Sequence, residues 1–136
     1  MKGVSVILSH MSYIAIGIAA LSLIVASVYM WGGRIEEIYL QKELEAVKSS
    51  IVSDVIELNR ISGTNTIAEL GAGLPDKISG ESYSVEFNSN TLTIRSKTNK
   101  GDSVEVNASF DFDVADSSAV SPFTIKLKDG KIYLVD

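Results

Sequence analysis

Residues 4–31 of the chain read VSVILSHMSYIAIGIAALSLIVASVYMW and contain no Asp, Glu, Lys or Arg. At about 1.5 Å per residue, a helix over this segment is roughly 42 Å long, longer than the roughly 30 Å hydrocarbon core of a bilayer. Charged residues flank the segment, with Lys2 before it and Arg34 after it. The segment therefore predicts a helix that is able to span a membrane.

Three interpretations of this segment differ in what surrounds it. A cleaved secretory signal has an apolar run of about 7 to 15 residues before a small-residue cleavage site, and this run is much longer. A buried core helix is disfavoured, because the segment is apolar on all faces and the rest of the chain is too short to enclose it. We therefore expect a retained helix that lies in a membrane or in the core of a filament.

The remainder of the 136-residue chain is enough for one small domain. The net charge of the whole chain, −5, offers no basic face for phosphates, so nucleic-acid binding is not expected. The absence of Cys excludes disulfides, thiolate metal sites and Cys nucleophiles. Lys2 and the N-terminal amine favour a cytoplasmic N-terminus, and a polar domain after the span then lies outside the membrane.

The helical pattern continues beyond Gly32-Gly33, but it becomes one-sided. In residues 34–62 apolar side chains recur at three- and four-residue steps while charged residues occupy the other faces, which predicts an amphipathic helix that ends near Ile61 before Ser62-Gly63. Each Gly costs a helix about 1 kcal/mol relative to Ala, so Gly32-Gly33 is a weak point rather than a break. The predicted apolar face consists of Ile35, Ile38, Leu44, Val47, Ile51, Val55 and Leu58.

The C-terminal half changes from a helical period to a period of two. Residues 63–80 are rich in Gly and predict a loop with one short helical turn at residues 67–70. Residues 81–136 predict an antiparallel β domain, a single sheet or a small sandwich, whose apolar face is covered by the amphipathic helix. The five predicted strands cover residues 83–87, 92–94, 104–114, 123–127 and 132–134, with turns at residues 88–90, 99–102 and 129–130 and a break at residues 116–121. The fold class is therefore α+β, in five segments at residues 1–3, 4–33, 34–62, 63–80 and 81–136.

Small residues in the apolar segment predict a helix-packing surface. Ala15 with Ala19, and Ser22 with Ala26, are pairs spaced by four residues that let helices approach closely in an apolar medium. The same spacing also arises from composition alone, because Ala and Ser are common in such segments. His10, the only histidine, lies near Ser9 and Ser12 at a depth where an ionisable group is a functional candidate. We favour the simpler interpretation, a neutral imidazole bonded to a serine or to a carbonyl of a neighbouring helix.

The exposed domain shows no catalytic pattern. Without Cys and with its single His in the span, it cannot assemble a Ser-His-Asp or Cys-His site, so we expect no enzyme activity and no cofactor. Asp111, Asp113 and Asp116 are near enough in sequence to hold Ca²⁺, but they lack EF-hand spacing, and solvated edge charges are the favoured interpretation, with no metal. Asn107-Ala108-Ser109 is a sequon on the polar face of the longest predicted strand, which predicts N-glycosylation at Asn107 and an external surface.

The arrangement resembles archaeal type IV pilin-like proteins, including archaellum-type filament subunits made with class III signal peptides. The likeness rests on Lys2-Gly3-Val4-Ser5 before a charge-free helix, and on the runs LPDKISGESY at residues 74–83 and NTLTI at residues 90–94. The resemblance implies that a prepilin peptidase cuts between Gly3 and Val4. It also implies that the precursor lies in the plasma membrane and that assembled copies form a cell-surface filament.

These patterns lead to two expected functions. The first is a structural subunit that self-associates into an extracellular filament through its apolar helix, because bundled copies can replace lipid around that helix. The second is a single-span membrane-anchored accessory or binding protein that does not polymerise, such as a minor pilin, an adhesion module or a protein that contacts an envelope layer.

Overall fold

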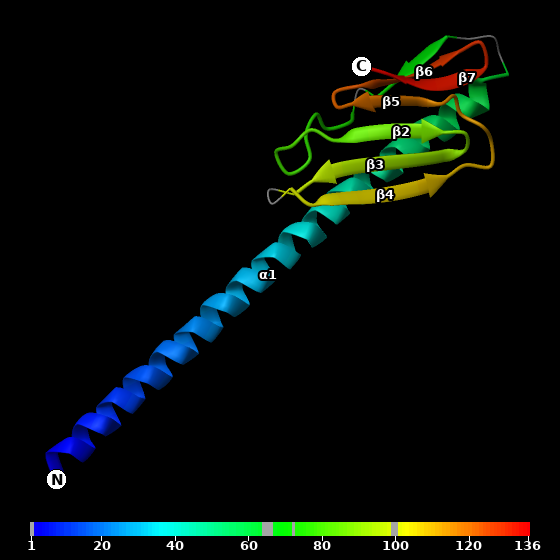
Figure 1. Ribbon diagram of the computed structural model, residues 1–136. Helices are drawn as coiled ribbons and strands as arrows, with labels where there is room; N and C mark the ends of the chain where they lie inside the picture. Colours follow the sequence, from blue (N-terminus) through cyan, green and yellow to red (C-terminus); the bar gives the residue numbers. More distant parts are fainter. Residues whose placement is uncertain (1, 64–66, 72, 99–100) are drawn as a thin grey trace. The chain divides into compact units, whose positions relative to one another are not determined.

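The computed structural model describes residues 2–63, 67–71, 73–98 and 101–136, and for residue 2 only the backbone. In this part of the chain one helix is followed by seven strands (Figure 1). The elements are α1 (Lys2–Ile61), β1 (Ala68–Leu70), β2 (Ser84–Asn88), β3 (Thr91–Lys97), β4 (Ser103–Ser109), β5 (Ser117–Val120), β6 (Thr124–Lys128) and β7 (Lys131–Val135). This is the predicted α+β fold, a long N-terminal helix followed by small antiparallel sheets.

The helix continues through Gly32-Gly33 and ends at the predicted residue, Ile61. The chain forms two compact units, Met1–Glu36 and Glu37–Asp136. The second unit contains the C-terminal part of α1 and all the described strands, and it holds the whole hydrophobic core. The fold of the β domain can therefore be described within this unit alone.

The strands form two antiparallel sheets, ordered β1-β6-β7 and β4-β3-β2-β5. Two tight hairpins set the register. In the β6–β7 hairpin Lys128 pairs with Lys131 around Asp129 and Gly130, whose φ angles are 54° and 74°. Positive φ at both central residues is the turn geometry that Asp-Gly favours between twisted strands, which confirms the predicted turn. The β2–β3 hairpin has the predicted turn at Ser89, with φ 54°.

The two sheets meet at β5 and β7. The backbone N–H of Leu134 donates to Ser117 Oγ (3.1 Å), and the N–H of Val120 donates to Asp136 Oδ1 (3.0 Å). The N–H of Ala115, just before β5, donates to the carbonyl of Ile132 (2.9 Å). These bonds occupy polar groups along the side of β5 that does not pair with β2.

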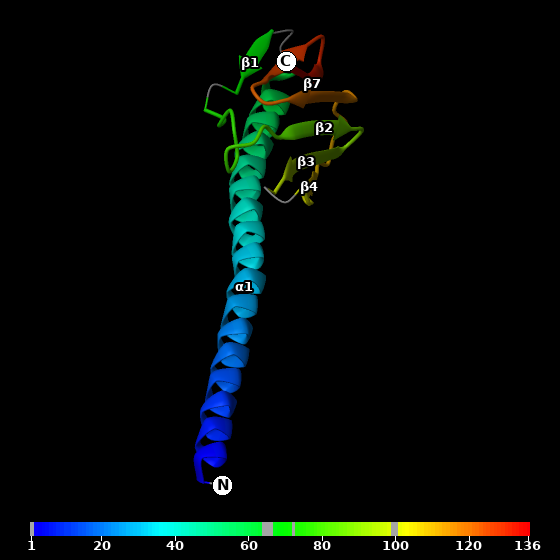
Figure 2. The ribbon, with the colours of Figure 1, turned by 60° about the vertical axis from the view of Figure 1, so that its left-hand side comes forward.

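The sheets lie along one side of the C-terminal part of α1 (Figure 2). The core lies between the sheets and this face of the helix. The helix contributes six fully or almost fully buried side chains: Leu40, Leu44, Val47, Ile51, Val55 and Leu58. Tyr83, Phe87, Phe110 and Phe123 are the largest buried groups outside the helix. Phe110 meets Phe87 edge-on with ring centroids 6.3 Å apart. The predicted burial of the amphipathic helix against the sheet is confirmed.

Two residues of the predicted helix face are not in this core. Ile35 and Ile38 are 49% and 54% exposed, whereas Leu40, which was not predicted, is fully buried. At about 100° per residue, Ile38 lies about 120° around the helix from Leu44, so both cannot face the same sheet. The buried face of the helix therefore begins at Leu40 rather than at Ile35.

The secondary structure predicted for the C-terminal half of the chain was wrong in three places. Residues 67–70 do not form a helical turn, because Ala68–Leu70 pairs with β6 as β1. The predicted strand 104–114 ends at Ser109, after which the N–H of Phe110 donates to the carbonyl of Asn90 (2.7 Å) and the chain crosses the β2–β3 turn. Residues 117–120, predicted as a break, form β5 against β2. Asn99 and Lys100 of the predicted turn at 99–102, and Met1 of the predicted leader, lie outside the described residues.

Candidate assembly site

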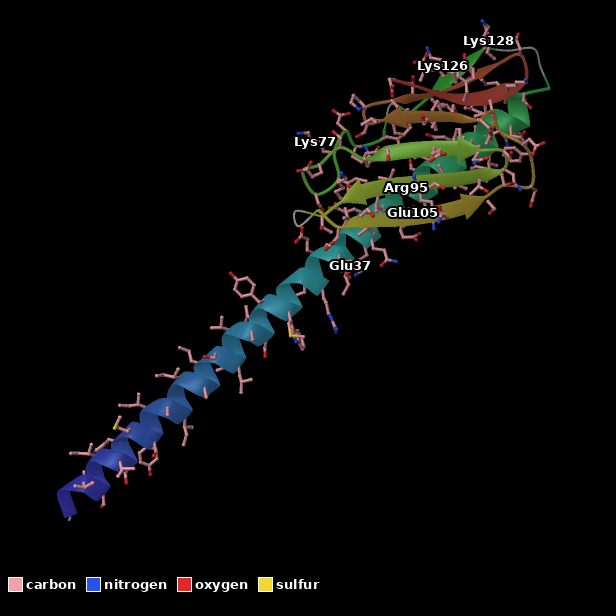
Figure 3. All side chains as sticks on the ribbon, in the orientation of Figure 1. Glu37, Lys77, Arg95, Glu105, Lys126 and Lys128 are labelled. Carbon is pink, nitrogen blue, oxygen red and sulfur yellow. The ribbon has the colours of Figure 1, made fainter. Side chains whose placement is uncertain are left out.

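The apolar segment of α1 is the most unusual surface of the molecule. Every large apolar side chain from Val4 to Trp31 is between 50% and 76% exposed. In Figure 3 these side chains project from the helix. By length and composition α1 is able to cross a membrane, and it is the one helix among the described residues that passes this test. So large an exposed apolar surface is compatible with a transmembrane helix or with a filament-core helix.

Four of the serine side chains of this segment are satisfied within the helix. Four serine hydroxyls donate to the carbonyl four residues earlier, at 2.8–2.9 Å: Ser9 to Ser5, Ser12 to Leu8, Ser22 to Ile18 and Ser27 to Leu23. Outside water an unbonded hydroxyl is costly, and this i−4 bond removes the cost without any partner helix. The serines are therefore suited to apolar surroundings.

His10 is exposed on the same segment. The hydroxyl hydrogens of Ser9 and Ser12 are used in bonds to backbone carbonyls, so neither hydroxyl donates to the imidazole. The expected bond between His10 and a neighbouring helix stays a prediction.

The four small residues predicted to mediate helix packing lie on one strip of α1. At about 100° per residue, Ala15, Ala19, Ser22 and Ala26 fall within an arc of roughly 60°. All four are exposed, and the bond from Ser22 to Ile18 leaves no free hydroxyl hydrogen on the strip. The strip is therefore narrow and apolar, and its role in packing stays a prediction.

The predicted cleavage position lies in the first turn of α1, which begins at Lys2. A Cβ added to Gly3 would meet no atom within 4 Å, and Val4 is 63% exposed. Cleavage between Gly3 and Val4 stays a prediction.

The outer face of the four-stranded sheet carries a row of polar contacts across three strands. Arg95 on β3 donates from Nε to Glu105 Oε2 on β4 (2.6 Å), and its NH1 lies 3.5 Å from Glu86 Oε2 on β2. Figure 3 shows Arg95 and Glu105 on adjacent strands. The hydrogen bonds from Arg95 and from Asn107 lower the pKa of Glu105, and the bond to Glu105 raises the pKa of Arg95. Because all these side chains are solvent-exposed, the row contributes little to stability.

Asn107 of the predicted sequon is exposed on this face. Its Nδ2 donates to Glu105 Oε1 at 3.1 Å, and its strand, β4, is an edge strand of the sheet. An exposed amide on an external surface would be open to modification, and N-glycosylation at Asn107 stays a prediction.

The sequence pattern places Asp111 and Asp113 on one face of a strand, with Asp116 in the turn after it, but neither Asp111 nor Asp113 lies on a strand. Asp111 and Asp113 follow the end of β4, and Asp116 Oδ1 accepts a hydrogen bond from the backbone N–H of Ser89 (2.7 Å). Across the described residues no group of three or more His, Cys, Asp or Glu side chains could hold a metal ion. Asp116 instead supports the β2–β3 turn.

A cavity that the sequence did not predict lies between α1 and the loop before β2. It has a volume of about 310 Å³, and its lining includes Val47, Leu74 and Ile78. Glu43 at its rim accepts hydrogen bonds from the N–H (3.0 Å) and the hydroxyl (2.9 Å) of Ser79. The partners are 36 residues apart, so no local sequence pattern identifies them. Glu43 therefore holds the loop to the helix.

Comparisons of the chain with protein-family models, with curated proteins and with solved structures found no match. The long apolar N-terminal helix and the antiparallel sheets after it are compatible with a pilin-like fold.

Proposed function

We propose that the chain is a structural subunit of an extracellular filament of the type IV pilus kind. The apolar segment of α1 forms the filament core, and the β domain forms the outer layer. The precursor of the subunit lies in the plasma membrane. A prepilin peptidase removes residues 1–3, and the mature subunit is then assembled into a filament at the cell surface.

The observation that carries this proposal is the surface of residues 4–31. Its large apolar side chains are exposed, and four of its serine hydroxyls are bonded inside the helix. Such a helix is suited to lipid or to other apolar helices. The transfer from lipid to a helix bundle gains little from the hydrophobic effect, so close packing of small residues must favour the bundle. The strip that includes Ala15 and Ala19 supplies a surface for that packing.

Shearing of cells that express the chain, followed by negative-stain microscopy, tests the proposal. We expect filaments in the sheared fraction, with this chain as their repeating unit. Ala19→Leu adds bulk on the strip and should sharply reduce sheared filament, because overpacking a helix contact costs about 1–3 kcal/mol. Ala20→Leu is the matched control, since Ala20 lies about 100° around the helix from Ala19 and is also exposed.

Membrane fractions show whether either variant still inserts, so a loss of filament can be separated from a loss of the protein. A chain that stays with the membrane and never enters sheared filaments contradicts the proposal. Equal effects of Ala19→Leu and Ala20→Leu would contradict the role of the strip.

The second candidate function is a single-span anchor for an accessory or binding domain. The same exposed apolar surface favours it, because a bilayer surrounds such a helix as well as a bundle does. The mass of the native N-terminus separates the two functions. A start at Val4 supports the filament subunit, and an intact Met1 supports the plain anchor.

A further inference from the structure

Strand β4 is an open edge of the four-stranded sheet. All seven of its residues pair with β3 in unbroken register, and among the described strands none lies on its other side. The opposite edge, β5, has its outer side bonded to Leu134 and Asp136. Proteins usually protect an open edge with charged side chains, especially Lys, with Pro or with a bulge. The sequence of β4, SVEVNAS, has no Lys and no Pro, and its register with β3 has no bulge. Its one charged residue is Glu105.

The sequence of β4 is chemically symmetric about Val106. Ser103 and Ser109 are at the two ends, and Val104 and Ala108 are both small apolar residues on the inner face. Glu105 and Asn107 are at equivalent positions on the outer face, one a hydrogen-bond acceptor and the other a donor. An antiparallel pair of identical strands needs this kind of symmetry, because each residue meets its mirror position in the second copy.

We propose that β4 binds β4 of a second copy of this chain, antiparallel and centred on Val106. In this register Val106 meets Val106, and each Glu105 meets Asn107 of the second copy. The two side chains already form a 3.1 Å hydrogen bond within one chain, so their chemistry is complementary. The contact uses the Asn107 amide without a glycan, so chains that are glycosylated at Asn107 do not form it. Like charges do not oppose each other anywhere in the pair, and the inner faces of the two sheets lie on the same side.

The symmetry of this contact determines which copies it joins. A two-fold axis normal to the sheet reverses every direction in the sheet plane, including that of the helix packed on it. Subunits of one filament all point the same way, so the contact joins subunits of two filaments that run in opposite directions. This last step rests on the proposed function, whereas the pairing of β4 with itself does not.

Disulfide trapping tests the pairing, because the chain has no Cys of its own. Full-length Glu105→Cys and Asn107→Cys chains, produced without N-glycosylation and solubilised in detergent, are oxidised separately and as a mixture. In the proposed register position 105 lies directly opposite position 107 of the second copy, with Cβ atoms about 4.5–5.5 Å apart. Two copies of the same position are diagonal neighbours, about 7–8 Å apart. The mixed disulfide, between positions 105 and 107, should therefore form on the order of tenfold faster than the symmetric disulfide of either variant alone. The control mixture replaces Asn107→Cys with Ser118→Cys, an exposed position on β5.

Equal rates for the mixed and symmetric disulfides, or an equal rate with the Ser118→Cys control, would overturn the proposal. A second variant tests it without cysteines. Asn107→Glu places two Glu–Glu pairs in the contact and should weaken self-association, measured by sedimentation, about fivefold or more. Adding Glu105→Gln should restore it, and a failure of that rescue also counts against the pairing. Filament yield after shearing is measured separately, so loss of the pairing and loss of the filament remain distinguishable.

Discussion

Replacing Ile51 by Ala should remove much of the stability of the β domain. Ile51 is fully buried in the contact between α1 and the sheets. Truncating a buried Ile costs about 2–5 kcal/mol, which combines the lost transfer free energy with a term for the cavity. A domain of this size has roughly 5–15 kcal/mol of stability in total, and each kcal/mol is worth about 4–8 °C in Tm. The variant should therefore melt roughly 10 °C or more below the unchanged protein.

Ile56→Ala is the matched control for this prediction. Ile56 is on the same helix, has the same chemistry and is 52% exposed, and the two substitutions change helix propensity equally. Urea unfolding of the full chain in detergent, followed by the near-UV circular dichroism of its tyrosines, measures both. We expect a loss below about 0.5 kcal/mol for Ile56→Ala. If the two variants lose the same stability, the helix face assigned to the core is wrong.

Three further predictions concern polar groups of the β domain. The buried hydroxyl of Ser96 has no hydrogen-bond partner among the described residues, so Ser96→Ala should leave the free energy of unfolding unchanged or raise it by about 1 kcal/mol. A clear loss of stability in urea unfolding would show that the hydroxyl does form a hydrogen bond. Burial raises the pKa of Tyr83 from 10.0 to about 12, so the unfolded chain loses this proton first and the free energy of unfolding should fall as the pH rises from about 10 to 12. Tyr83→Phe should flatten that part of the pH profile of stability, and an unchanged profile would contradict the burial of Tyr83. Glu43→Ala removes the acceptor of two hydrogen bonds from Ser79, so it should lower the free energy of unfolding by about 1 kcal/mol and speed the hydrogen exchange of the Ser79 amide. An unchanged exchange rate would show that these bonds do not hold the loop.

The strands that the sequence predicted are those with a local signal. Asp129-Gly130 favours one turn type, and the apolar alternation on each side of it is unambiguous. β5 has no such signal, because SSAV contains no alternation of large apolar and polar residues. Its register is imposed by β2, which lies about 30 residues earlier in the chain. The alternation after Ser109 is genuine, since Phe110 and Val114 are buried, but it belongs to a segment that crosses a turn rather than to a strand.

The features of the candidate site also fall into two groups, those that the sequence predicts and those that it does not. The apolar segment, its small residues and the exposed sequon are visible in the sequence, because each depends on composition or on spacing within a few residues. The edge position of β4 and the bond from Ser79 to Glu43 are not visible, because each depends on which segments distant in the chain become neighbours.

The amino-acid sequence by itself determined the apolar N-terminal helix, its amphipathic continuation to Ile61 and the two tight hairpins. These features follow from hydrophobic period and turn chemistry, which act between residues close in the chain. Only the tertiary structure decided that Leu40 replaces Ile35 and Ile38 in the core, that the strands divide into two sheets, and that β4 is left as an open edge. Those outcomes depend on how the sheets and one helix face bury each other, and the free energy of that burial is shared among residues far apart in sequence.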